Sequence, residues 1–113
     1  MIRVTFTENG NNLSLRLEGH AGYAEIGNDI VCASATILAG TVAQLVMEAD
    51  YKGDLESTPE IKLEPGDSLI SCKPTEEAMD KMKNIYSFAK TGYVVLAYNN
   101  PQYVELISVG KDI

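Results

Sequence analysis

Cys32 and His20 are the residues of this 113-residue chain whose side chains and spacing could carry nucleophilic chemistry. A cysteine attacks as a thiolate, which a helix N-terminus and a neighbouring imidazole both stabilise. Asp29 is a good helix N-cap, and it places Cys32 at the third position of a predicted helix. Unpaired backbone N–H groups there favour negative charge and could also hold an oxyanion. The pattern predicts a thiol nucleophile with an imidazole as its general base.

Each of these residues also has a plainer interpretation. A lone histidine in a loop is usually solvated, and a lone cysteine at a helix start usually packs against its neighbours. Cys72 lies in a predicted strand without a cap or a histidine near it, and we interpret it as inert. Two cysteines and a single histidine do not form a zinc site, so we expect neither a metal nor a cofactor.

Alternating apolar residues predict strands on either side of two turns. The first pair covers residues 2–6 and 13–17, and the second pair covers residues 61–63 and 68–73. Asn and Gly supply the first turn, and Pro65-Gly66-Asp67 supplies the second. Residues 103–109 predict a last strand.

Helical spacing of apolar residues predicts two helices. One covers residues 30–50 behind its cap at Asp29, and the other extends from Pro74 to about Tyr98, with acidic residues in its first turn and Gly92 interrupting it. The resulting order is strand-strand-helix-strand-strand-helix-strand. It predicts an α/β fold of the α+β type, with a small, mainly antiparallel sheet and two helices in a single domain over residues 1–113.

The segment between the second strand and the first helix carries the histidine. Its three glycines, Gly19, Gly22 and Gly27, predict a flexible loop. Because this loop returns directly to the helix start, its connectivity allows the imidazole of His20 to reach the sulfur of Cys32.

The composition limits the partners. A formal charge of −7 argues against nucleic acid as a direct ligand and favours basic partners, although acidity also keeps a small protein soluble. No secretory signal and no uninterrupted apolar run of membrane-spanning length is visible, so we expect a soluble protein without a membrane partner. Two cysteines in such a chain fit a reducing, cytoplasmic compartment.

A longer motif surrounds the histidine and the cysteine. It resembles the signature of the bacterial ribosomal-processing cysteine protease family, Prp, in the runs Gly19-His20-Ala21-Gly22-Tyr23-Ala24 and Gly27-Asn28-Asp29-Ile30-Val31-Cys32-Ala33. The resemblance implies a catalytic dyad of His20 and Cys32, with the motif aspartate at Asp29. Family members commonly carry a serine one helical turn after the cysteine, where this chain has Thr36, with a further hydroxyl at Ser34.

The resemblance also implies a function and partners. It implies a cytoplasmic cysteine endopeptidase that pairs as a homodimer, with the glycine-rich loop able to rearrange over the site. The substrate would be the N-terminal extension of large-subunit ribosomal protein number twenty-seven, removed during ribosome maturation. Two alternatives stay open: a non-catalytic ribosome-assembly module that binds a basic protein, and a hydrolase of another small thioester or amide.

Overall fold

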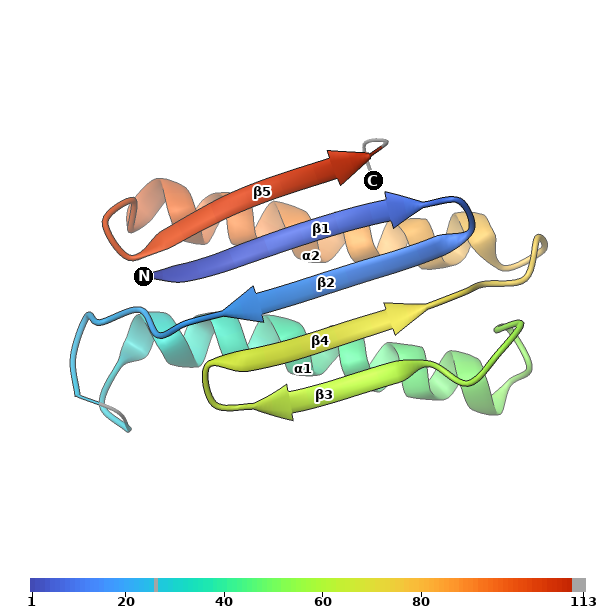
Figure 1. Cartoon of the computed structure of the whole chain (residues 1–113), viewed down its shortest axis with the longest axis horizontal. Helices are drawn as coiled ribbons and strands as arrows, with labels where there is room; N and C mark the ends of the chain where they lie inside the picture. The colour runs from blue at the N-terminus through green and yellow to red at the C-terminus, as the bar shows by residue number, and fades with distance from the viewer. Residues whose placement is uncertain (26, 111–113) are drawn as a thin grey trace.

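The computed structural model of the protein describes residues 1–25 and 27–110 (Figure 1). The predicted order of strands and helices is confirmed. The elements are β1 (Ile2–Asn9), β2 (Asn12–Glu18), α1 (Ile30–Tyr51), β3 (Glu60–Glu64), β4 (Asp67–Cys72), α2 (Met79–Asn99) and β5 (Val104–Gly110).

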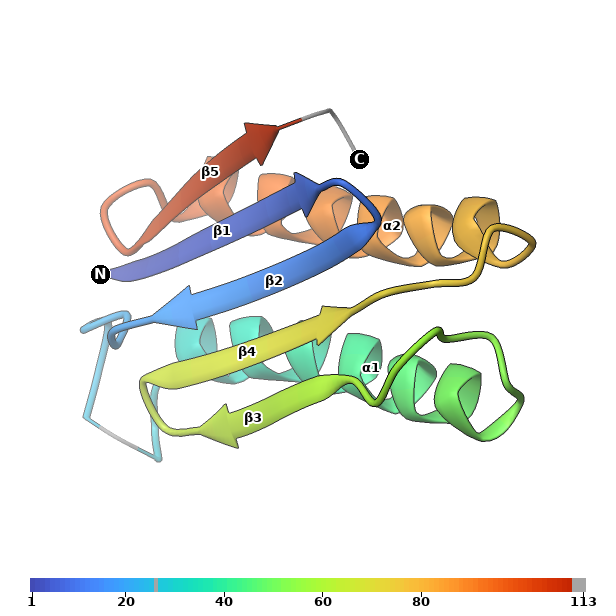
Figure 2. The same cartoon turned by 45° about the vertical axis from the view of Figure 1, so that its right-hand side comes forward.

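The five strands form a single sheet in the order β3-β4-β2-β1-β5. All neighbouring pairs are antiparallel except β1 and β5, which are parallel, so the predicted mainly antiparallel sheet is confirmed. Figures 1 and 2 show both helices behind the same face of the sheet, with α2 behind β1 and α1 behind β4 and β3. Within residues 1–25 and 27–110 no helix covers the other face, and β3 and β5 form the two edges of the sheet.

Strand alternation places the apolar side chains toward the helices. Every second residue of the first hairpin is buried there, and these residues are Ile2, Val4, Phe6, Leu13, Leu15 and Leu17. The strand β1 continues to Asn9, beyond the predicted end, so the same alternation also turns Glu8 inward. Its carboxylate lies 3.5 Å from the ammonium of Lys83 on α2, which compensates part of the cost of burying the charge.

The helix α1 buries its sheet-facing side. Among the described residues, α1 is the one helix that length and composition alone would allow to cross a membrane, but a core helix of a soluble protein passes the same test. Its sheet-facing side is buried, as in a core helix, and 33% of the apolar window is buried within the chain. The buried residues are Val31, Ala35, Ala39, Val42, Ala43, Val46 and Ala49.

Gly92 lies where the two helices meet. A Cβ atom on this residue would lie 2.9 Å from a methyl group of Leu38, so a larger residue would force the side chain of Leu38 to shift. The hydroxyl of the next residue, Tyr93, donates a hydrogen bond of 2.7 Å to the carbonyl of Ala35. The glycine that interrupts the helical pattern therefore serves the packing of α1 against α2.

The second helix begins later than predicted, at Met79 rather than Pro74. Pro74 instead forms a β-bridge with Leu55, and a turn follows in which the hydroxyl of Thr75 accepts the N–H of Ala78. The acidic residues that favoured the earlier start lie in this turn and are exposed.

Candidate active site

The predicted nucleophile and base lie at the same end of the molecule. Glu18 ends β2 and Ile30 begins α1, and both ends lie together in Figures 1 and 2. His20 follows β2 by two residues, whereas Cys32 is the third residue of α1 and is half-buried. The predicted position of Cys32 in the first turn of a helix is therefore confirmed.

Asp29 joins the start of α1 to the loop in front of it. One carboxylate oxygen accepts the backbone N–H of Cys32 at 2.9 Å, which confirms the predicted N-cap. The other accepts the N–H groups of Tyr23 at 3.0 Å and Ala24 at 3.3 Å. The hydrogen bond from Cys32 contributes most to holding the pKa of this carboxyl below its ordinary value of 3.8. The side chain thus ties the loop and the helix start to each other.

These hydrogen bonds limit where an oxyanion can bind. The N–H of Cys32 donates to the side chain of Asp29, and the N–H of Ala33 donates to the backbone carbonyl of Asp29 at 3.0 Å. Both donors are occupied in this conformation, so the expectation that the helix start offers them to an oxyanion is not met here.

The two predicted hydroxyl residues are tied to their own helix. Thr36 donates to the carbonyl of Cys32 at 2.8 Å, and Ser34 donates to the carbonyl of Ile30 at 2.7 Å. Thr36 therefore contacts the residue that carries the thiol, through its backbone, whereas Ser34 faces solvent one turn from Ile30. Both are exposed.

The loop glycines adopt a backbone that other residues rarely adopt. Gly19, Gly22 and Gly27 have φ values of 90°, 73° and 94°. Gly19 is also packed closely, because a Cβ atom there would lie 2.6 Å from the carbonyl oxygen of Met1. Whether the loop moves stays a prediction.

The imidazole of His20 lies over the turn between β3 and β4. A Cβ atom on Gly66 in that turn would lie 2.7 Å from Nε2 of His20, and the N–H of Gly19 donates to the carbonyl of Gly66 at 2.9 Å. His20 is exposed, and among the described residues no hydrogen bond joins it to Cys32. The structure brings the predicted pair to one end of the fold without closing the contact between them.

The position of the imidazole can be tested with two glycines of equal backbone strain. Gly66 and Gly10 have φ values of 73° and 60°, so alanine should cost each about 1–2 kcal/mol of unfolding free energy. Only at Gly66 does the new methyl group meet His20, since nothing lies within 4 Å of a Cβ on Gly10. We expect Gly66→Ala to shift the NMR signals of the single histidine ring and Gly10→Ala to leave them in place. Equal spectra would show that His20 does not lie on this turn.

Sequence reasoning missed two contributors to this region. Gly66 was assigned only a turn, and nothing in the pattern placed a histidine 46 residues earlier on top of it. Tyr103, which precedes β5, contacts the loop through an edge-to-face pair with Tyr23 at a ring distance of 5.3 Å. Tyr103 was assigned to the start of the last strand, which begins one residue later, at Val104, and an aromatic residue in the loop does not by itself identify its partner.

Cys72 is buried on the helix-facing side of β4. The hydroxyl of Tyr86 lies 3.6 Å from its sulfur, and burial raises the pKa of the thiol. A raised pKa keeps the thiol protonated, which agrees with the prediction that Cys72 is inert. Across the described ranges, no three histidine, cysteine or acidic side chains gather as a metal site would require.

Comparisons with known proteins match this chain to one family and to several solved structures. The family model described as cysteine protease Prp matches residues 1–105. The structure resembles that of an essential ribosomal processing protease Prp from S. aureus with a covalently linked product peptide, with a TM-score of 0.72 and 20% identity over 96% of this chain and 99% of that one. The same protease with a substrate peptide gives a TM-score of 0.67 and 19% identity over the same shares.

A further structure, SMU.848 from Streptococcus mutans, has a TM-score of 0.67 and 26% identity over 97% of this chain and 96% of that one. No curated protein sequence matches. The family match covers the loop, the capping aspartate and the start of α1. The chain therefore belongs to the cysteine protease Prp family.

Proposed function

We propose that the chain removes the N-terminal extension of large-subunit ribosomal protein number twenty-seven, with Cys32 as nucleophile and His20 as general base. The single observation that carries the proposal is the family match across the loop that holds His20 and the helix start that holds Cys32. The S. aureus relative, a ribosomal processing protease, has been crystallised with substrate and product peptides. Ribosomal proteins are basic, so a chain with a formal charge of −7 attracts such a substrate electrostatically.

The reaction begins with the transfer of the thiol proton of Cys32 to the imidazole of His20. The thiolate adds to the scissile carbonyl carbon, and the tetrahedral intermediate collapses as the leaving amine takes the proton back from His20. A thioester then joins the N-terminal fragment to the sulfur. Water, deprotonated by the same imidazole, hydrolyses this thioester and restores the thiol.

The proposal requires the imidazole to leave the turn on which it lies. His20 contacts Gly66 in the structure, and proton transfer needs a nitrogen of the ring within hydrogen-bond distance of the sulfur of Cys32. The loop between β2 and α1 has three glycines, so a rotation of the side chain with a shift of this loop is the simplest route.

The test is incubation of the purified chain with the extended ribosomal protein, followed by intact-mass spectrometry. We expect one cut that releases the N-terminal extension and leaves the rest of the protein whole. No cut, or cuts at many positions, would contradict the proposal.

The alternatives give different results in the same assay. A non-catalytic assembly module would bind the ribosomal protein without cutting it, and iodoacetamide would alkylate Cys32 no faster than it alkylates an ordinary exposed thiol. In a hydrolase of small thioesters or amides, iodoacetamide would alkylate Cys32 readily, but the enzyme would leave the extension in place. Membership of a cysteine protease family favours the protease. We propose a cytoplasmic location because the substrate is a component of the ribosome.

We further propose that two copies pair through the outer face of the helices. Between α1 and α2 lies a hollow of about 320 Å³, lined mainly by apolar residues of both helices, with the 82%-exposed ring of Phe88 at its side. Residues 30–47 of α1 contain no charged side chain, so this face suits an apolar surface. A two-fold axis would place each Phe88 against the other copy's hollow, a self-complementary arrangement. The aliphatic lining residues are Leu38, Val42, Leu45, Ile85 and Ala89.

Phe88→Glu should therefore give a monomer, because the carboxylate cannot be buried unpaired in an apolar interface. The matched control is Tyr51→Glu, which adds the same charge in place of an aromatic side chain that is 94% exposed at the far end of α1. Sedimentation velocity at micromolar concentration should show a dimer for the wild type and for Tyr51→Glu. A monomeric wild type, or dimeric Phe88→Glu, would exclude this interface.

A further inference from the structure

The strand β3 forms one edge of the sheet and has a free side. A two-residue turn at Pro65 and Gly66 joins it to β4, with Glu64 paired to Asp67. In such a turn the two flanking residues exchange backbone hydrogen bonds. Along an antiparallel ladder, hydrogen-bonded pairs alternate with pairs that are not hydrogen-bonded. The backbone N–H and C=O groups of Ile61 and Leu63 therefore point away from β4, toward the edge where a further strand could bind.

This edge leads to the candidate active site. The turn at the end of β3 is the one that His20 covers, through Gly66. Figures 1 and 2 place this turn near the end of β2, with the start of α1 behind it. An extended chain that follows the edge of β3 toward this turn therefore approaches the imidazole.

The thiol lies on the matching side of α1. The residues of α1 that line the hollow beside α2 include Leu38 and Leu45, so they mark the side that faces α2. Cys32, Thr36 and Gly40 follow one another at the four-residue spacing of a helix row, on the other side of the buried stripe. In Figure 1 the start of α1 lies between α2 and the turn end of β3, so this row lies on the side of that turn.

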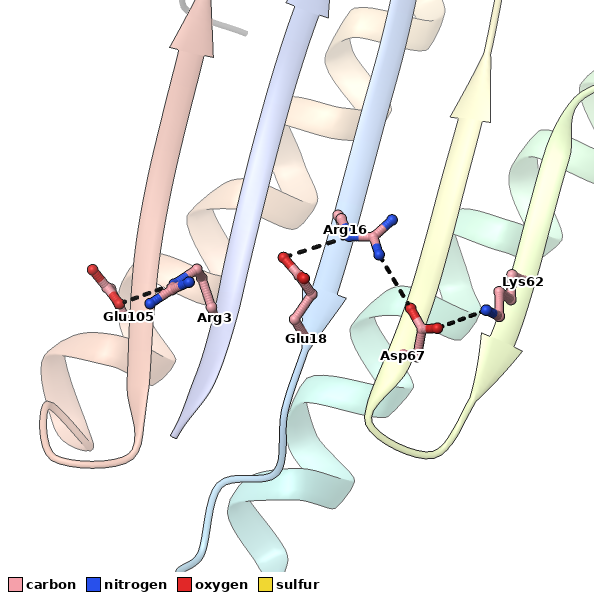
Figure 3. Close-up of polar contacts among 6 residues, drawn as sticks. All are labelled: Arg3, Arg16, Glu18, Lys62, Asp67 and Glu105. Atoms are coloured by element: carbon pink, nitrogen blue, oxygen red, sulfur yellow. Dashed lines mark hydrogen bonds and ion pairs between the residues drawn. The ribbon is translucent and has the colours of Figure 1, made fainter.

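The edge is acidic and partly apolar. Glu60 and Glu64 are exposed, and Leu63 is 49% exposed. Figure 3 shows the one basic residue of the strand, Lys62, paired with Asp67 at 2.6 Å; it also lies 3.6 Å from the carboxylate of Glu64. The positive charge of Lys62 is therefore offset within the sheet, and the strand presents net negative charge to a neighbour.

We propose that β3 binds the substrate by strand addition: the extended chain next to the scissile bond pairs with the backbone of Ile61 and Leu63, and its basic side chains lie beside Glu60 and Glu64. Main-chain hydrogen bonds give affinity in this mode, and cross-strand charge pairs give selectivity. The occupant is thus an extended, basic peptide segment. The inference rests on the proposed function, for which it names the docking surface.

Hydrogen exchange tests the pairing directly, without any substitution in β3. The full-length Cys32→Ala variant is mixed with a synthetic peptide that spans the proposed cleavage site and its basic flank. We expect the amide protons of Ile61 and Leu63 to exchange at least tenfold more slowly with the peptide bound. Unchanged exchange at these two amides, or slowing confined to the other edge strand, β5, would overturn the proposal.

Two substitutions of Leu63 separate the contribution of its backbone N–H to peptide binding from that of its side chain. Leu63→Pro removes the outward N–H, and proline is tolerated on an edge strand where that N–H faces solvent. We expect it to weaken binding of the peptide about tenfold, and Leu63→Ala, which keeps the N–H, to weaken it several-fold less. Glu60→Gln with Glu64→Gln should weaken binding and reduce its dependence on salt. Equal affinity for Leu63→Pro and Leu63→Ala would contradict strand addition.

The two proposals fail in different ways. Absence of cleavage by the wild-type chain contradicts the proposed function. Cleavage by the wild type together with unprotected β3 amides contradicts only the docking surface. Alkylation of Cys32 in Leu63→Pro at the wild-type rate shows that any loss of peptide binding does not arise from a damaged helix start.

Discussion

Cys32→Ala is expected to abolish removal of the N-terminal extension, with a loss of at least about 10⁴-fold in rate, because no other group can form the thioester. The fold should persist, since the helix cap uses the backbone N–H of Cys32 and this N–H is kept in alanine. The measurement is a time course of cleavage by mass spectrometry, together with thermal unfolding.

His20→Ala should lose about 10²- to 10⁴-fold, the range that a positioned general base contributes. Cys72→Ala is the matched control, because it removes the other thiol, which is buried on β4 away from the helix start. It should keep nearly full cleavage. Retained cleavage in Cys32→Ala, or a comparable loss in Cys72→Ala, would take the nucleophile's role away from Cys32.

The fold was predictable where a single periodicity decided the structure. Alternation predicted the first hairpin because one face of β1 and β2 is buried along its whole length. Asp29 predicted the start of α1 because its carboxylate has a local partner three residues ahead. The start of α2 was misplaced because Pro74 is used by a β-bridge to Leu55, a contact between segments 19 residues apart that no local pattern contains.

For the candidate site, the sequence indicated which residues to consider but not how they are arranged. The types and order of His20, Asp29 and Cys32 indicated the chemistry, and the topology brings them to one end of the sheet. The contact of His20 with Gly66 depends on the register between β2 and β4, which carries the turn to the end of β2. A register of this kind is set by tertiary packing, so a local motif does not contain it.

Asp29→Ala is expected to lower cleavage about 100-fold, because it frees both the helix start and the loop from the group that joins them, and small misplacements of reacting groups cost rates of this order. Asp29→Asn separates the two roles. Asparagine caps helices as well as aspartate does, but its amide offers only one acceptor oxygen in place of two. If the cap takes that oxygen, the N–H groups of Tyr23 and Ala24 lose their acceptor, so we expect a folded protein with reduced cleavage and a lower free energy of unfolding than the wild type at neutral pH. Full activity in both variants would show that Asp29 is only a structural cap and does not contribute to cleavage.

The pH dependence of unfolding isolates the charge of Asp29. Backbone N–H groups, first that of Cys32, lower the pKa of the folded carboxyl below 3.8, so the folded state binds the proton more weakly than the unfolded state. The stabilisation is therefore complete above about pH 4 and is lost as the pH falls through the lower pKa of the folded state. Asp29→Asn lacks this titration, so the difference in unfolding free energy between it and the wild type should shrink below pH 4. A difference that stays constant from pH 7 to pH 2.5 would mean that the N–H groups bind the amide oxygen as well as the carboxylate, and that the helix start gains nothing from the negative charge beside Cys32.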